Sequence, residues 1–255
     1  MSDYRRRSRT QENLLNLYLR LNGFFVTSFI VHSPAPGKNR TEIDALAVRH
    51  PYNGEPERVI GPSPYLETSS ELTDLLICEV KSEGRPLQFN EALRDSIPAI
   101  KSVLRWAGLF REEELQDLAS EFQTRLQPSY SPRQDIPSAP GPRSTRVRAI
   151  LCSPGRWNRQ DSQPWFINGS EIFEYLWQCF CPETPRDSCS TRYDFGLWGE
   201  SYEPLVRYFK DRGQKGPGKL KDLYQYLVIY RVIRSPRITS CTRLGGPIHR
   251  APWRL

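Results

Sequence analysis

The sequence predicts an α/β fold, because helical and strand-like segments follow one another along a chain that is large enough for a hydrophobic core. Residues 10–21 carry apolar side chains at helical spacing. Three segments rich in apolar and β-branched residues follow, at 24–32, 41–50 and 71–82, and residues 87–110 return to helical spacing. With 255 residues, of which 38% are hydrophobic, the chain can build one good-sized core.

The first predicted helix ends at Asn22-Gly23, a typical stop signal, and Thr10 is its candidate N-cap. Its apolar stripe consists of Leu14, Leu17, Tyr18 and Leu21. The first strand is followed by a turn-like segment, and the second and third strands are joined by a Pro- and Gly-containing connection at 51–70. Because this connection is longer than a hairpin needs, it is either a functional flap or an irregular insertion.

The helix predicted at 87–110 is interrupted at Pro98. The charged segment 111–122 predicts a further helix whose exposed surface is solvated. Residues 127–145 are rich in Pro and Ser, which is typical of a loop or linker inserted in the core.

A fourth strand is predicted at 147–155, followed by a short strand and an amphipathic helix capped by Ser170. We therefore expect a core domain over residues 1–180. Residues 181–255 are expected to form an extension with two more helices, at 202–211 and 220–233, and a basic tail.

Net charge and apolar runs limit the class of protein. A formal charge of +7 favours polyanionic partners such as nucleic acid. No segment approaches the roughly 20 apolar residues of a membrane helix, and the N-terminus lacks a secretory apolar region. Six cysteines are few for this length, so most are expected to be free thiols in a cytoplasmic protein.

Two segments carry charged residues at strand spacing. TEIDALAVRH places Glu42 and Asp44 two residues apart, and DLLICEVKS does the same with Glu79 and Lys81. Since strand side chains alternate between faces, all four charges are predicted to converge on one side of the sheet. The neighbours predicted on the other side are Ile43, Ala45, Cys78 and Val80. Half-buried carboxylates need partners, and a divalent cation can serve several at once.

An acid on one strand followed by Glu-x-Lys on the next resembles the PD-(D/E)XK nucleases, in particular Holliday-junction resolvases and Mrr-like restriction enzymes. The matching residues are Asp44, Glu79 and Lys81, with Glu12 on the preceding helix as a further acid. The resemblance covers roughly the first hundred residues, and Ile43 stands where the motif has proline. It implies a restriction-endonuclease-like core, with a central mixed β-sheet flanked by helices and additional C-terminal helices.

The resemblance also implies roles for single residues in a Mg²⁺-dependent reaction, in which Mn²⁺ can substitute. Asp44 and Glu79 would bind the metal together with the Val80 carbonyl, and Glu12 would hold a metal-bound water or a second ion. Lys81 would orient or deprotonate the attacking water. An acid in a first helical turn is also favoured by the helix dipole, so Glu12 has a structural alternative. Glu42 is either a further ligand or a strand-edge acid.

Other candidate residues are weaker. Gln88, just after the third strand, is the preferred auxiliary residue, ahead of Glu91. The three histidines are too scattered for a histidine-based site: His32, His50 and His249. A zinc site at Cys179, Cys181 and Cys189 with Cys241 or His249 is disfavoured, because Cys-x-Cys lacks the usual knuckle spacing.

Two basic segments are candidate phosphate contacts. The N-terminal segment contains Arg5, Arg6, Arg7 and Arg9, and the chain after Asp222 has six arginines and no acid. Such contacts give salt-dependent, sequence-tolerant affinity, although either segment can equally be a free basic tail. Three tyrosines near the C-terminal arginines can stack on bases or belong to the core: Tyr224, Tyr226 and Tyr230.

The function predicted from these residues is a metal-dependent nuclease, with DNA preferred over RNA as substrate. The alternative is a non-catalytic nucleic-acid-binding or assembly protein that keeps the nuclease fold. A homodimer is expected from the resemblance alone.

Overall fold

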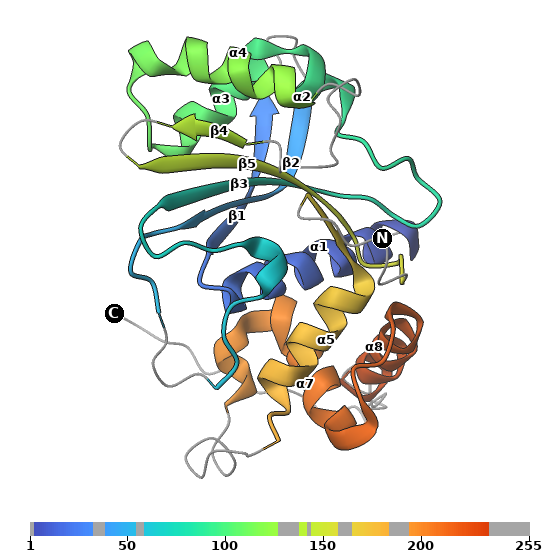
Figure 1. The fold of residues 1–255 in the computed structure, drawn as a ribbon. Coiled ribbons are helices and arrows are strands. Elements are labelled where there is room, and N and C mark those ends of the chain that lie inside the picture. The colour runs from blue at the N-terminus through green and yellow to red at the C-terminus, as the bar shows by residue number, and fades with distance from the viewer. Residues whose placement is uncertain are drawn as a thin grey trace, which may run out of the picture.

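The computed structural model describes residues 3–32, 39–54, 59–126, 138–141, 144–157, 165–183 and 194–234. A mixed β-sheet forms the middle layer, and helices cover both of its faces (Figure 1). The predicted α/β class, with a mixed sheet between helices, is thereby confirmed.

The sheet has the strand order β1-β2-β3-β5-β4, and β6 also pairs with β5. Strands β3 and β5 are parallel, as are β5 and β6, while the other neighbours are antiparallel. The strand bounds are β1 Phe25–His32, β2 Asn39–Arg49, β3 Thr73–Val80, β4 Ser138–Gly141, β5 Thr145–Ser153 and β6 Phe166–Asn168.

The helices divide into two groups, one on each face of the sheet. Their bounds are α1 Asp3–Leu21, α2 Glu91–Asp95, α3 Ile97–Ala107, α4 Leu115–Leu126, α5 Gly169–Phe180, α7 Gly199–Arg212 and α8 Leu220–Arg234. Short 3-10 turns lie at Pro64–Leu66, Glu112–Glu114, Phe195–Trp198 and Gly213–Lys215. Helices α2, α3 and α4 pack on one face, and α1 and α5 pack on the other (Figure 1). No helix that the structure describes combines the length and the apolar character needed to span a lipid bilayer.

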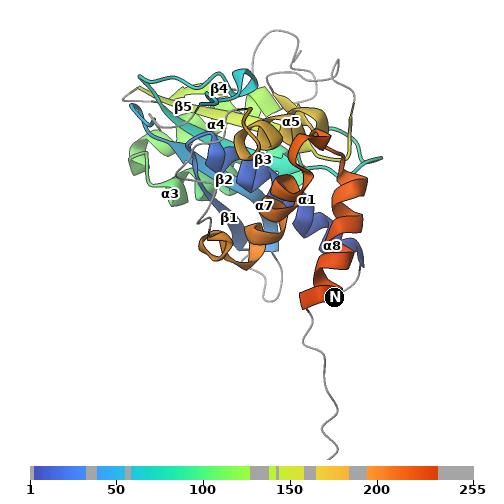
Figure 2. The same cartoon turned by 90° about the horizontal axis from the view of Figure 1, so that it is seen from below.

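The hydrophobic core extends beyond residue 180. Buried side chains of α7 and α8, such as Phe209 and Leu223, belong to the same cluster as Leu17 of α1 and Phe173 of α5. Figure 2 shows α7 and α8 packed beside α1. The extension after residue 180 is helical, as predicted, and it completes the core on this face of the sheet.

Helix α1 begins about two turns earlier than predicted, so the arginine run is helical. Thr10 lies inside the helix, and its hydroxyl donates to the Arg6 carbonyl oxygen at 2.9 Å. Thr10 is therefore not the N-cap. The prediction that Ser170 caps α5 is also wrong, because the Asn168 side chain accepts the Glu171 N–H at 3.2 Å.

Two predictions between residues 87 and 145 need correction. The first is the break near Pro98: α2 and α3 meet at Ser96, whose hydroxyl accepts the Ala99 N–H, so Pro98 lies in the first turn of α3. The second is the loop at 127–145: residues 127–137 and 142–143 lie outside the described part of the chain, but β4, at Ser138–Gly141, pairs with β5.

Helix α4 is not simply a solvated helix, because it covers the sheet. Leu118, Ala119 and Phe122 are buried in the core on this face. The charged residues of the 111–122 segment are exposed or half-buried, and Glu112, in the turn before α4, pairs with Arg105 of α3. Because charged residues dominate the composition of the segment, composition alone did not reveal its apolar stripe.

The connection between β2 and β3 is an anchored insertion over its described residues. Leu66 is fully buried, the Ser63 N–H donates to Asn22 Oδ1 at 2.7 Å, and Arg49 donates to the Ser69 carbonyl at 2.7 Å. This connection joins the C-terminal end of β2 to the N-terminal end of β3. It therefore lies at the opposite end of β3 from Glu79.

We expect Gly169→Ala to destabilise the protein by about 1–3 kcal/mol. A Cβ at this position would overlap the Pro154 carbonyl oxygen and lie 2.9 Å from that of Arg156, and neither backbone group can swing away like a side chain. Urea denaturation measures the effect. Gly61→Ala is the matched control, because no atom lies within 4 Å of its added Cβ. Equal stability of the two variants would contradict the expectation.

Candidate functional site

A β-bulge in β2 positions the first acidic residue. Thr27 pairs with Leu46 and Phe29 pairs with Ile43, so two steps along β1 match three along β2. The extra residue lies at Asp44-Ala45, and bulges of this kind re-aim side chains. The prediction that Ile43 and Ala45 share one side of the sheet is consequently wrong, because they belong to the cores on opposite faces.

Asp44 lies where β2 and β3 stop pairing. The last paired residues are Ala45 and Cys78, and beyond them Asp44 Oδ2 accepts the Val80 N–H at 2.7 Å. Burial raises the pKa of Asp44 to about 7, the Val80 hydrogen bond opposes that rise, and the carboxylates of Glu12 and Glu79 add to it. Asp44 is thus a carboxylate whose negative charge is poorly compensated by the fold.

Glu79 and Lys81 form an ion pair next to Asp44. Lys81 Nζ donates to Glu79 Oε1, and Glu79 Oε2 accepts the Asn90 N–H at 2.7 Å. The two side chains are only 10% and 17% exposed. The charge of Lys81 also lowers the pKa of Asp44, which places the amine close to both acids.

Glu12 approaches the site from α1. Its Oε1 accepts a hydrogen bond from Ser8 at 3.0 Å, and its charge raises the pKa of Asp44. The sequence-predicted residues Asp44, Glu79, Lys81 and Glu12 therefore gather at the C-terminal end of β3, where its pairing with β2 stops. Val80 is also here, and its N–H rather than its carbonyl makes the contact with Asp44.

Gln88 and Glu42 are not drawn into the site. Gln88 is exposed in the segment between β3 and α2. Asn90, two residues later, contacts Glu79 instead through its backbone and caps α2 with its side chain. Glu42 is exposed opposite Ile30 of β1, as the strand-edge alternative predicted.

Within the described residues, no three His, Cys, Asp or Glu side chains are arranged to hold a metal ion together. The donor set offered by this site is two carboxylates, Asp44 and Glu79, with Glu12 near Asp44. Magnesium commonly uses one or two protein carboxylates and fills its other positions with water and substrate oxygens, so this set fits that ion.

Of the disfavoured zinc ligands, Cys181 is a free thiol, as are Cys78 and Cys152. This agrees with the predicted reduced cysteines. Cys189, Cys241 and His249 lie outside the described residues.

The N-terminal arginines are exposed on the first turns of α1. Arg7 pairs with Asp3 at 2.9 Å, and its guanidinium lies 5.2 Å from the ring centre of Tyr224 on α8. Tyr226 and Tyr230 are stacked on each other and face α7, where their hydroxyls bond to Asp211 and Glu203. Only Tyr224 of the three tyrosines therefore lies beside an N-terminal arginine.

Two residues that hold the site were not foreseen. Asn90 fixes Glu79 through its backbone N–H, and the Ser153 hydroxyl donates to the Lys81 carbonyl at 2.6 Å. Ser153 ends β5, which runs parallel to β3, so the two strand ends meet at one edge. A parallel pairing of the predicted third and fourth strands would have placed Ser153 next to Lys81.

Comparison with known proteins finds no matching family model, no significantly similar protein of curated function and no significantly similar solved structure. The resemblance to the PD-(D/E)XK nucleases accordingly rests on the motif residues and stays a prediction.

Proposed function

We propose that this protein is a metal-dependent nuclease that hydrolyses phosphodiester bonds, most simply a DNA endonuclease with a restriction-endonuclease-like core. One observation carries the proposal: Asp44 and Glu79 come together where β2 and β3 stop pairing, with the Lys81 amine on Glu79. Their types and chain order are those of the motif found in the sequence.

The electrostatics of the site support a cation-binding role. A carboxylate with a pKa of about 7 is held in its charged form at a free-energy cost when the site is without a cation. Since burial and two neighbouring acids are the causes, a divalent cation beside Asp44 and Glu79 would relieve all three. A purely structural site gains nothing from such a group of like charges.

Each side chain of the site can have its own role in hydrolysis. Asp44 and Glu79 would hold the cation, which neutralises charge on the phosphate and on the leaving oxygen. Lys81 is kept next to them by its bond to Glu79, where its amine can orient the attacking water and stabilise the negative charge that develops. The Asn90 N–H fixes the other oxygen of Glu79, which keeps that carboxylate aimed at the site.

Lys81→Met is expected to lower the cleavage rate by about 10²-fold or more, because it removes the only cation bound to the acids in the described part of the site. Plasmid, branched DNA and RNA are incubated with Mg²⁺ or Mn²⁺, and products are followed over time. Asp44→Asn should lose activity equally, although its amide oxygen can still accept the Val80 N–H.

Lys101→Met, on α3, is the matched control and should cleave normally, because the Lys101 amine bonds to Gln116 of α4 at 3.3 Å rather than to an acid of the site. Equal cleavage by the Lys81, Asp44 and control variants would refute the site assignment.

The alternative is a non-catalytic nucleic-acid-binding protein with this fold. The observation that favours it is the Lys81–Glu79 ion pair, since an amine and a carboxylate already satisfy each other. Calorimetric titration with Mn²⁺ separates the two: a nuclease binds the ion in an Asp44-dependent manner, and a non-catalytic protein of this kind does not.

A further inference from the structure

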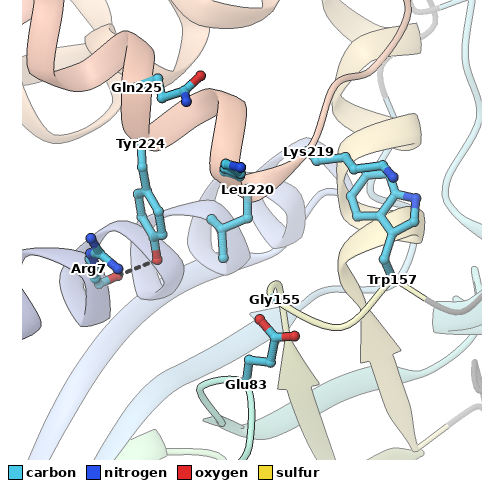
Figure 3. Close-up of a pocket in the computed structure, with 9 residues that line it drawn as sticks. Arg7, Glu83, Gly155, Trp157, Lys219, Leu220, Tyr224 and Gln225 are labelled. Atoms are coloured by element: carbon cyan, nitrogen blue, oxygen red, sulfur yellow. Dashed lines mark hydrogen bonds between the residues drawn. The ribbon is translucent and has the colours of Figure 1, made fainter.

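A cleft of about 570 Å³ opens between α1, α8 and the turn that follows β5. Its size is that of ordinary small-ligand sites. Figure 3 shows Tyr224 and Arg7 on one side of it, Trp157 and Lys219 on the other, and Leu220 between them. Lys221 and Gln225 of α8 also line it, and Glu83 and Gly155 complete it.

Two aromatic rings in the cleft are accessible to planar ligands. Trp157 and Tyr224 are each half-buried. Lys219 Nζ lies 5.5 Å from the Trp157 ring centre, and the Arg7 guanidinium lies 5.2 Å from that of Tyr224. Trp157 also packs against the core, so the ring face below Lys219 is the part that a ligand would reach after the ammonium moves aside.

The charge of the cleft suits an anion. Arg7, Lys219 and Lys221 contribute three positive charges, against one carboxylate from Glu83. Lys219 and Lys221 are exposed, so their ammonium groups can move toward a bound phosphate at little cost. Rings for stacking, together with mobile cations for phosphate, are what single-stranded nucleic acid requires.

The cleft adjoins the acidic site through three chain segments. Glu83 follows Lys81 by two residues, and Gly155 follows Ser153, whose hydroxyl bonds to the Lys81 carbonyl. On α1, Arg7 precedes Glu12 by five residues, a rise of about 7.5 Å along the helix. A strand held in the cleft would thus be within a few nucleotides of Asp44 and Glu79.

We propose that this cleft binds an unpaired nucleotide, with the base against Trp157 and the phosphate on Lys219 and Lys221, and that it thereby guides a single strand toward the acidic site. This proposal rests on the nuclease function for its biological purpose. Its binding chemistry does not, so the two can be tested separately. It predicts that substrates with an unpaired segment, such as flaps, overhangs or branch points, are preferred over continuous duplex.

The test is fluorescence anisotropy with a labelled short oligothymidylate in EDTA, which prevents metal-dependent cleavage. Trp157→Leu should weaken binding about tenfold, because stacking on one aromatic side chain is worth that much or more. Trp106→Leu is the matched control, since Trp106 is half exposed on α3 against Phe29, in the layer covering the other face.

Since Trp157 also contacts the core residue Phe173, a second variant avoids the risk of misfolding. The double change Lys219→Glu and Lys221→Glu alters only exposed side chains. It should weaken binding at least tenfold and flatten the dependence of affinity on salt. Lys101→Glu is its control. Unchanged affinity in this charge-reversed variant would overturn the proposal.

Competition identifies the source of the nucleotide. If thymidine monophosphate displaces the oligomer only at far higher concentration, a strand is the ligand. If the free nucleotide binds as tightly, the strand-guiding role is overturned. If binding depends on Trp157 but the natural protein cleaves no substrate, only the nuclease proposal is wrong. If the natural protein cleaves but binding does not depend on Trp157, only the cleft proposal is wrong.

Discussion

Asp74→Asn is expected to destabilise the protein by about 3–5 kcal/mol, because it breaks a buried ion pair and leaves a charge without compensation. Arg148 is fully buried and Asp74 is 1% exposed. The guanidinium binds the carboxylate through two nitrogens, with Nε 2.9 Å from Oδ1 and Nη2 on Oδ2. Arg146 adds two more hydrogen bonds, from Nη2 to Oδ2 at 3.0 Å and from Nε to Oδ1 at 3.4 Å.

The surroundings of Arg148 explain the size of the effect. Burial lowers the pKa of the guanidinium, and Asp74 is the main group that opposes this. Because arginine stays protonated in proteins, the variant cannot escape the cost by losing a proton. Nη1 of Arg148 already lacks a hydrogen-bond partner among the described residues, so no spare acceptor is at hand.

Urea denaturation of Asp74→Asn gives the change in the free energy of unfolding. The matched control is Glu112→Gln, which breaks the exposed pair with Arg105 and should leave stability unchanged. Replacing both Asp74 and Arg148 by leucine should recover much of the lost stability, since it removes the desolvation cost together with the attraction. If Asp74→Asn is as stable as the natural protein, the Asp74–Arg148 pair does not contribute the expected free energy of unfolding.

Most elements were predictable because each depends on local spacing, but β4 was not, since it lies in the Pro- and Ser-rich segment. Strand alternation predicted that Glu79 and Lys81 lie on the same side of their strand, and helical spacing predicted the buried side of α1. The bulge at Asp44-Ala45 was not predictable, because it arises from a mismatch with β1 rather than from the residues of β2 themselves.

Contacts between residues far apart in the chain could not be predicted from the sequence either. Arg148 looks like a single charge in an apolar strand, and its partner Asp74 lies on another strand, 74 residues earlier. The same holds for Trp157 and Tyr224, which line one cleft although 67 residues separate them by number. Pairing of this kind follows from the order of strands and the packing of helices, which one sequence does not specify.

In metal-free protein, Asp44 should make stability fall as the pH rises. The pKa of this carboxyl is raised from 3.8 to about 7, chiefly by burial. Between these two values the folded protein keeps a proton that the unfolded chain releases, so the stabilising contribution is complete below about pH 4 and is lost as the pH passes 7. With allowance for the partial exposure of Asp44, the loss should be about 2–4 kcal/mol.

Asp44→Asn removes this dependence, because the amide does not ionise and can still accept the Val80 N–H. In EDTA, the variant should be more stable than the natural protein at pH 8 and no more stable at pH 4. Asp117→Asn, on the exposed side of α4, makes the same chemical change away from the site and serves as the control. Parallel stability profiles for all three proteins would contradict the raised pKa.

Adding Mn²⁺ at pH 8 then connects this stability to function. If the cation compensates Asp44 and Glu79, the natural protein should gain about 2.7 kcal/mol at a hundredfold excess over the dissociation constant, and Asp44→Asn should gain much less. The ion would thus stabilise the site at a pH where ionised Asp44 destabilises the metal-free protein. A gain of equal size in both proteins would place the binding elsewhere, and the acidic pair would lose its role as a metal site.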